Sequence, residues 1–131
     1  MRALRLRIGE DSYAVPMALA REVVSLPVVT ALPTAPASVL GVCNVRGEII
    51  PVFDTGVLLG LGAVGSFGAV AIIETALGPA GLAMTDIGES VELGDVVGAT
   101  ETPGTTGVFA IGDGLAVLVD VEALLSPARI G

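Results

Sequence analysis

The sequence predicts an all-β domain with short helices, and three observations lead to this prediction. Its 53% hydrophobic content rests on aliphatic residues and 18 glycines, with 3% aromatics, which is typical of branched aliphatic strands joined by tight turns. Apolar and charged residues alternate near the N-terminus, and a strand-Asp-Leu-Leu unit occurs twice. A length of 131 residues suits a single domain spanning residues 1–131.

The first third of the chain is expected to be β-structure with a proline-rich crossing. Leu4, Leu6 and Ile8 fall on one face of a strand at residues 3–8, with Arg5 and Arg7 on the other. Residues 9–12 are predicted to form a turn. Further strands are predicted at residues 13–17 and 20–26, followed by an extended connection through Pro27, Pro33 and Pro36 that ends in a helical turn at residues 37–40.

The remainder of the chain alternates predicted strands with turn residues. Arg46 and Gly47 form a predicted tight turn between strands at residues 42–45 and 48–53, and this turn would present Arg46. Asp113 and Gly114 form a second hairpin turn, into a strand at residues 115–119. Other strands are predicted at residues 69–74, 82–85, 90–93 and 108–111.

The repeated unit predicts two similar substructures. Asp54 and Asp120 each follow an apolar strand and precede a leucine pair. Each aspartate stands where an N-cap would start a short helix, because its carboxylate accepts the first free amide N–H groups. The repeat therefore predicts two small barrels, each plugged by a short helix.

Charge composition narrows the class of partner. The chain has a net charge of −8, with six arginines and no lysine or histidine, and no cationic residue between Gly47 and Ala128. Nucleic acids and anionic membranes require cationic surfaces, so the partners should be proteins. Two charge-free stretches, residues 23–45 and 55–73, are interrupted by proline or glycine, which opposes a membrane-spanning helix. A cytoplasmic location is expected.

Catalytic and metal-binding residues are sparse. Without histidine or lysine, the usual general bases, Schiff-base lysines and catalytic triads cannot be assembled. Cys43 is the one cysteine and is expected to be buried. The carboxylates between Asp86 and Glu101 match no compact calcium loop and are expected to form a solvated acidic edge. We therefore expect no enzyme activity, no cofactor and no metal.

One motif offers an alternative function. Gly60, Gly62 and Gly65 match the GxGxxG pattern of dinucleotide-binding loops, and Asp86 is a candidate ribose acceptor. The pattern requires a strand running into the first glycine and a helix leaving the last, whereas here a short helix precedes and a β-like run follows. A loop without nucleotide is the favoured interpretation, and a nucleotide-binding enzyme is the less favoured one.

Glu22 and Arg46 each interrupt an apolar neighbourhood on or beside a predicted strand. Burying either charge without a partner is costly, so one interpretation is that they meet across the barrel and hold the presenting turn. The other is that they are unrelated surface charges. The sequence leaves both interpretations open.

Several segments together resemble the CheW family of bacterial chemotaxis coupling proteins, over nearly the entire chain. The most specific is Gly41-Val-Cys-Asn-Val-Arg-Gly47, which runs on into Glu-Ile-Ile-Pro-Val-Phe-Asp54. Tyr13-Ala-Val-Pro16, Arg21-Glu-Val-Val24, Leu32-Pro33 with Pro36, residues 69–73, residues 86–91 and residues 112–125 complete the pattern.

The resemblance implies two five-stranded β-barrel subdomains on a shared apolar core. It also implies a non-enzymatic adaptor in receptor arrays at the inner membrane, which couples chemoreceptor cytoplasmic tips to the like-folded regulatory domain of a histidine kinase. A small acidic scaffold for another receptor or kinase system is the alternative. By position, the resemblance implies binding roles for Glu22, Gly41, Asn44, Arg46 and Gly47, and an apolar receptor groove between the subdomains lined by Ala20, Val23, Val39 and Val42.

Overall fold

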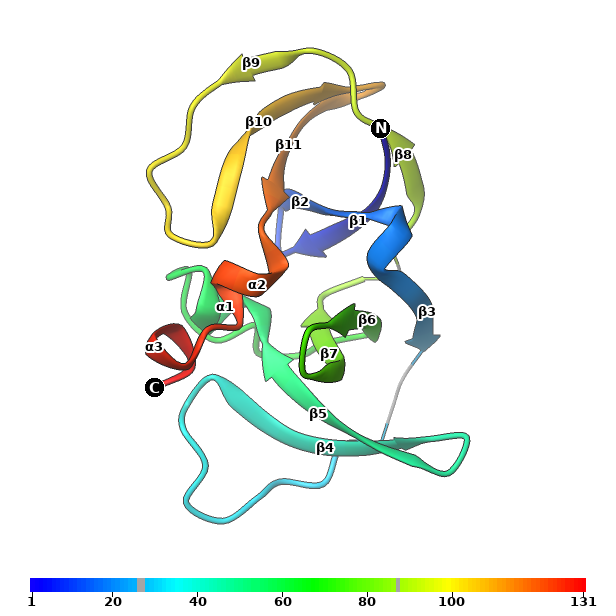
Figure 1. The fold of residues 1–131 in the computed structure, drawn as a ribbon, viewed down its shortest axis with the longest axis vertical. Helices are drawn as coiled ribbons and strands as arrows, with labels where there is room; N and C mark the ends of the chain where they lie inside the picture. Colours follow the sequence, from blue (N-terminus) through cyan, green and yellow to red (C-terminus); the bar gives the residue numbers. More distant parts are fainter. Residues whose placement is uncertain (26–27, 87) are drawn as a thin grey trace.

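Two curled β-sheets make up the fold in a computed structural model that describes residues 1–25, 28–86 and 88–131. Figure 1 shows β1, β2 and β8 to β11 in one half and β3 to β7 in the other, with the three α-helices gathered at one side. The elements are β1 Arg2–Ile8, β2 Asp11–Pro16, η1 Met17–Leu19, β3 Ala20–Ser25, β4 Val39–Val45, β5 Glu48–Asp54, α1 Thr55–Leu58, β6 Ala69–Thr75, β7 Gly78–Met84, β8 Ser90–Glu92, β9 Val96–Gly98, β10 Thr105–Ile111, β11 Gly114–Val119, α2 Val121–Leu124 and α3 Pro127–Ile130.

The first barrel is a six-stranded sheet in the order β8-β1-β2-β11-β10-β9. Strands β8 and β9 lie at opposite ends of this order but are neighbours in the chain, so the segment between them joins the two sheet edges. Leu93 donates its backbone N–H to Met1 at 2.9 Å, and Gly94 donates to Ala110 at 2.8 Å. The two short strands thus serve together as the closing strand of the barrel.

The second barrel is a five-stranded sheet in the order β3-β6-β7-β5-β4. Thr30, which precedes β4 in the chain, forms an isolated bridge with Val42 of that strand. Their two backbone hydrogen bonds measure 2.8 and 2.9 Å. This bridge adds a short segment at the edge strand β4 and helps to close the second barrel.

The repeated sequence unit corresponds to a repeated topology. Hairpins β4–β5 and β10–β11 each lead into a helix, and the last strand of each pairs in parallel with another hairpin, β5 with β7 and β11 with β2. Asp54 accepts from the Val57 amide and Asp120 from the Ala123 amide, both at 3.2 Å. The predicted N-caps, and the short helices that follow them, are confirmed.

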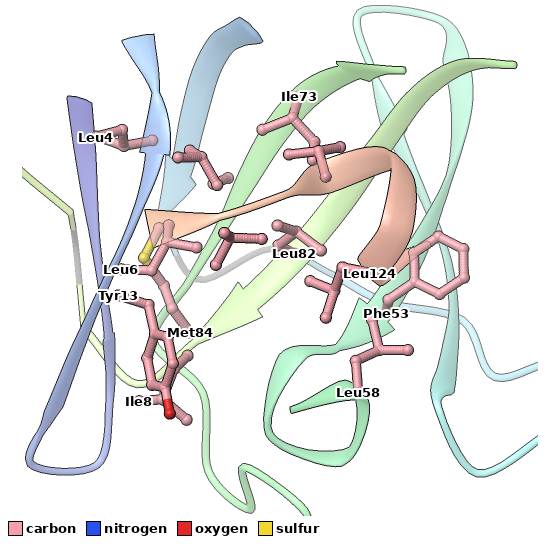
Figure 2. Close-up of a cluster of buried hydrophobic side chains, with 14 of the residues drawn as sticks. Leu4, Leu6, Ile8, Tyr13, Phe53, Leu58, Ile73, Leu82, Met84 and Leu124 are labelled. Atoms are coloured by element: carbon pink, nitrogen blue, oxygen red, sulfur yellow. The ribbon is translucent and has the colours of Figure 1, made fainter. Parts of the chain in front are cut away.

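Apolar side chains form a shared core between the barrels and a smaller core inside each barrel. In Figure 2, side chains from β1 and β2, from β6 and β7 and from the helices point toward a common centre. The shared core includes Leu6, Tyr13, Leu58, Leu82 and Leu124. Leu58 and Leu124, one from each repeat, are at most 1% exposed, so both short helices plug the same central core.

Several elements differ from prediction. Residues 37–40 form a turn and the start of β4 rather than a helical turn, because the Val39 amide bonds back to Pro36 and the chain then enters the ladder with β5. β9, α3 and η1 were not predicted. The predicted strand end at Leu26, and Pro27, lie outside the described residues. Among the described residues, no helix is long and apolar enough to cross a membrane.

Candidate protein-binding site at the Arg46 turn

The hairpin turn between β4 and β5 holds Arg46 in an unusual backbone conformation. Arg46 has φ 52° and Gly47 has φ 85°, and Val45 pairs directly with Glu48. A two-residue turn with positive φ at both positions follows the twist of the strands but disfavours side chains other than Asn, Asp and Gly. The Asn44 Oδ1 atom accepts from the Gly47 amide at 2.9 Å and braces the turn. The turn predicted around Arg46 and Gly47 is confirmed.

Glu22 and Arg46 meet across the second barrel. The Arg46 Nη2 atom lies 3.2 Å from a carboxylate oxygen of Glu22. The Arg46 side chain is 83% exposed and that of Glu22 is 23% exposed. An ion pair this exposed contributes little stability. It does hold the guanidinium near the turn, and because most of the Arg46 side chain is exposed, the guanidinium stays open to a partner protein.

A second charge cluster, which the sequence analysis missed, lies beside this pair. The Arg21 guanidinium donates to Glu48 and to Glu74, both at 2.8 Å. These hydrogen bonds, the one to Glu48 first, raise the pKa of Arg21 above its ordinary value. Arg21 thus links β3 to β5 and β6. The available sequence signal was the adjacent pair of opposite charges, Arg21 and Glu22, which lies at the irregular register between Ala20 and Glu22 in the ladder with β6.

Gly41 is required by close backbone packing. Its φ is +148°, and a Cβ atom at this position would lie 2.0 Å from the Thr30 carbonyl oxygen. A side chain here would push away the segment whose bridge to Val42 closes the second barrel. The structure thus gives Gly41 a packing role, at a position where the family resemblance implies a binding role.

The four expected groove residues do not share one surface. Ala20, Val23 and Val39 are partly buried and pack against the shared core between the barrels. Val42 is not part of that core and lines a separate groove with Val24 and Ile49, whose wall also includes Cys43 and Val45 from the core of the second barrel.

The glycine-rich loop is organised around a carboxylate of the protein itself. The Val64 amide donates to both oxygens of Asp54, at 3.1 and 3.2 Å, and the Leu61 amide donates to the Gly56 carbonyl. Asp54 is 3% exposed. A phosphate-binding loop needs free amides at a helix N-terminus, whereas here Asp54 accepts from amides of both the loop and α1. The geometry opposes the nucleotide interpretation of Gly60, Gly62 and Gly65.

Other candidate reactive groups are engaged in the fold. Cys43 is 4% exposed, as expected, and burial raises the pKa of its thiol. The acidic edge is only partly a solvated face, because Glu89 pairs with the buried Arg5 at 3.1 Å. Arg5, predicted on the polar face of β1, is itself 8% exposed. Within the described ranges, no group of three or more His, Cys, Asp or Glu side chains is arranged to hold a metal ion.

Comparisons with known proteins agree with this architecture. A CheW-like domain model matches residues 2–129. The chain is 37% identical over 60 residues to a chemotaxis protein CheW of Rhizobium meliloti strain 1021, and 36% identical over 58 residues to a probable chemotaxis protein CheW of Rhizobium etli. These matches span 46% and 44% of this chain, and 39% and 37% of those relatives.

A solved structure extends the similarity to the whole fold. The scaffolding protein TtCheW from Thermoanaerobacter tengcongensis superposes with a TM-score of 0.82 at 22% identity, covering 95% of this chain and 92% of that one. With nearly every residue inside the matched range, the chain belongs to the CheW-like domain family.

Proposed function

We propose that this chain is a non-enzymatic chemotaxis adaptor that couples the cytoplasmic tips of chemoreceptors to the regulatory domain of a histidine kinase. The observation that carries the proposal is the Arg46 turn. A non-glycine residue with positive φ is uncommon, and such strain is concentrated at functional sites. Here the strain presents a cation that is 83% exposed, on a rigid barrel of a CheW-like domain.

The surrounding contacts support a binding role for this turn. Asn44 and Gly47 shape the turn, and Glu22 holds the Arg46 guanidinium in place. Gly41 keeps the segment at Thr30 against β4. Ala20, Val23 and Val39 lie at the junction of the barrels, where an apolar helix tip would find partly buried apolar side chains. These residues form the proposed receptor- and kinase-binding set, with Val42 belonging to a different face.

The test is co-sedimentation with receptor-containing membranes and the cognate kinase, scored by kinase activation. The wild-type chain should sediment with the membranes and activate the kinase, whereas Arg46→Glu should lose activation because it reverses the presented charge. Arg2→Glu is a matched control, since Arg2 is also exposed but lies on β1 of the other barrel. Binding of the wild-type chain to neither partner would refute the proposal.

A charge exchange separates presentation of Arg46 from simple loss of an ion pair. The double variant Glu22→Arg/Arg46→Glu keeps the pair but moves the cation from the exposed turn to β3. We expect its folding to resemble wild type and its activation to stay lost. Restored activation would show that the pair itself, and not the cation at the turn, is what the partners need.

A further inference from the structure

We propose that Arg21 is a positioning residue for the Arg46 turn: by binding Glu48, it keeps that carboxylate from pairing with the Arg46 guanidinium. This inference rests on the adaptor function proposed above and adds a residue that controls which carboxylates reach the same turn. Two arginines and three glutamates form the turn cluster, which consists of Arg21, Glu22, Arg46, Glu48 and Glu74.

A β-bulge in β3 brings two successive charged residues to the end of the β4–β5 hairpin. The ladder with β6 skips one position between Ala20 and Glu22, so Arg21 is the extra residue. Bulges redirect side chains relative to the regular alternation of a strand. The Arg21 guanidinium lies 2.8 Å from Glu48, and the Glu22 carboxylate lies 3.2 Å from the Arg46 guanidinium. Figure 1 shows β3 on the same side of the second barrel as the turn of this hairpin.

Arg21 engages the other two carboxylates of the turn cluster with different nitrogen atoms. Its Nη1 atom donates to Glu48 and its Nε atom donates to Glu74, both at 2.8 Å. Such short, charge-assisted hydrogen bonds to a planar guanidinium fix the orientation of both carboxylates. The Glu48 side chain is 45% exposed, so without Arg21 it would be free to turn toward another cation.

The nearest cation on the hairpin for a released Glu48 is Arg46, because Gly47 alone separates the two residues. The turn cluster has one excess negative charge, and replacing Arg21 by glutamine would leave two, with Arg46 as its remaining cation. Opposite charges at this separation attract. Glu48 would then compete with a partner protein for the N–H donors of Arg46.

Arginine side-chain NMR tests this arrangement without any partner. The Arg46 Nε–H signal should move in Glu22→Gln, because that pair is lost, and stay in place in Glu48→Gln, because Arg21 holds Glu48 in the wild-type chain. In the Arg21→Gln background, Glu48→Gln should move the same signal, since the released carboxylate has paired with Arg46. Glu74→Gln is the matched control, because Glu74 is also bound by Arg21 but lies on β6; it should leave the Arg46 signal unchanged in that background.

Kinase activation links the arrangement to coupling. In the assay with receptor-containing membranes and the cognate kinase, Arg21→Gln should raise the concentration of chain needed for half-maximal activation about three- to fivefold, the size expected for a competing exposed ion pair. Glu48→Gln in the same background should restore the wild-type concentration, although it does not restore the contacts of Arg21. Glu74→Gln removes the same charge and should not restore it. Urea unfolding followed by circular dichroism should show every variant folded at the assay temperature.

Each result has a definite meaning. Rescue by Glu48→Gln and not by Glu74→Gln, together with the shift of the Arg46 signal, supports the positioning role. An Arg46 signal that does not respond to Glu48→Gln in the Arg21→Gln background overturns it. Normal activation by Arg21→Gln, no rescue by either variant, or equal rescue by both would also overturn it and leave the adaptor function standing. If the wild-type chain activates no kinase, the adaptor function is refuted, and the role of Arg21 in coupling falls with it.

Discussion

Replacing Asp54 by alanine should destabilise the fold more than the same change at its repeat counterpart, Asp120. Both aspartates cap short helices, with the capping amide at 3.2 Å in each case. Asp54 also accepts from the Val64 amide of the glycine-rich loop and is 3% exposed, whereas Asp120 is exposed. The two variants thus share the lost cap and differ in the lost loop contact.

The magnitudes follow from these contacts. Removing an N-cap costs about 1 kcal/mol, which is the whole expected effect for Asp120→Ala. For Asp54→Ala, losing a hydrogen bond to a charged acceptor adds about 1.5–3 kcal/mol, so the total is about 2.5–4 kcal/mol. A domain of this length should shift its Tm by about 3–5 °C per kcal/mol, which predicts about 12 °C for Asp54→Ala and about 4 °C for Asp120→Ala.

Thermal and urea unfolding followed by circular dichroism would measure both changes. Amide hydrogen exchange would add a local readout, because the Val64 amide should lose protection in Asp54→Ala and keep it in Asp120→Ala. Equal destabilisation by the two variants would refute the assignment of Asp54 as the organising group of the loop. Unchanged protection of Val64 in Asp54→Ala would do the same.

Three other perturbations test separate parts of the structure. Gly41→Ala should lower the free energy of unfolding by about 2–4 kcal/mol, from backbone strain and the loss of about two hydrogen bonds at the Thr30 bridge. Gly47→Ala is the control: a Cβ atom there meets open space, so the loss should be about 1 kcal/mol. Similar losses for the two variants would contradict this account. Arg21→Gln should destabilise the protein at low ionic strength, because it removes the ion pairs of Arg21 with Glu48 and Glu74. The difference in unfolding free energy between wild type and variant should shrink in about 1 M NaCl, where salt screens these pairs; a difference independent of salt would indicate a packing effect instead. The hydrogen bond from Arg5 lowers the pKa of Asp113 below its ordinary 3.8. The stabilisation that the Asp113 carboxylate contributes is therefore present above about pH 4 and is lost as the pH falls through the lowered pKa. Below about pH 4, Asp113→Asn should lose less stability on acidification than wild type, and parallel stability curves for the two proteins would count against the pairing.

Regular patterns in the sequence predicted most of the fold. Alternation placed β1 and β2, and the strand-Asp-Leu-Leu repeat predicted both capped helices and the two-barrel architecture. The Arg46 turn was predictable because two apolar runs flank a residue pair that ends in glycine. These features are local, so short-range sequence patterns are sufficient to reveal them.

Features that depend on distant parts of the chain were not predicted. β9 spans three residues, and its pairing with β10 is created by closure of the barrel. Arg5 resembled a solvent-facing strand residue, yet Glu89 and Asp113, far away in sequence, bury and neutralise it.

The two repeats use their equivalent hairpin turns in opposite ways. In the first barrel, Ile111 pairs with Gly114 across a turn in which Asp113 reaches back to the buried Arg5 at 3.1 Å, and neither turn residue has a positive φ. In the second barrel, the corresponding turn places Arg46 at positive φ and leaves it 83% exposed. A turn selected for stability alone would resemble the first. An arginine in the left-handed region adds backbone strain, and its exposed ion pair contributes little stabilising free energy to offset that strain. The difference between the two repeats is therefore an internal comparison that favours a binding role for the second turn, since both turns occupy the same place in the same topology.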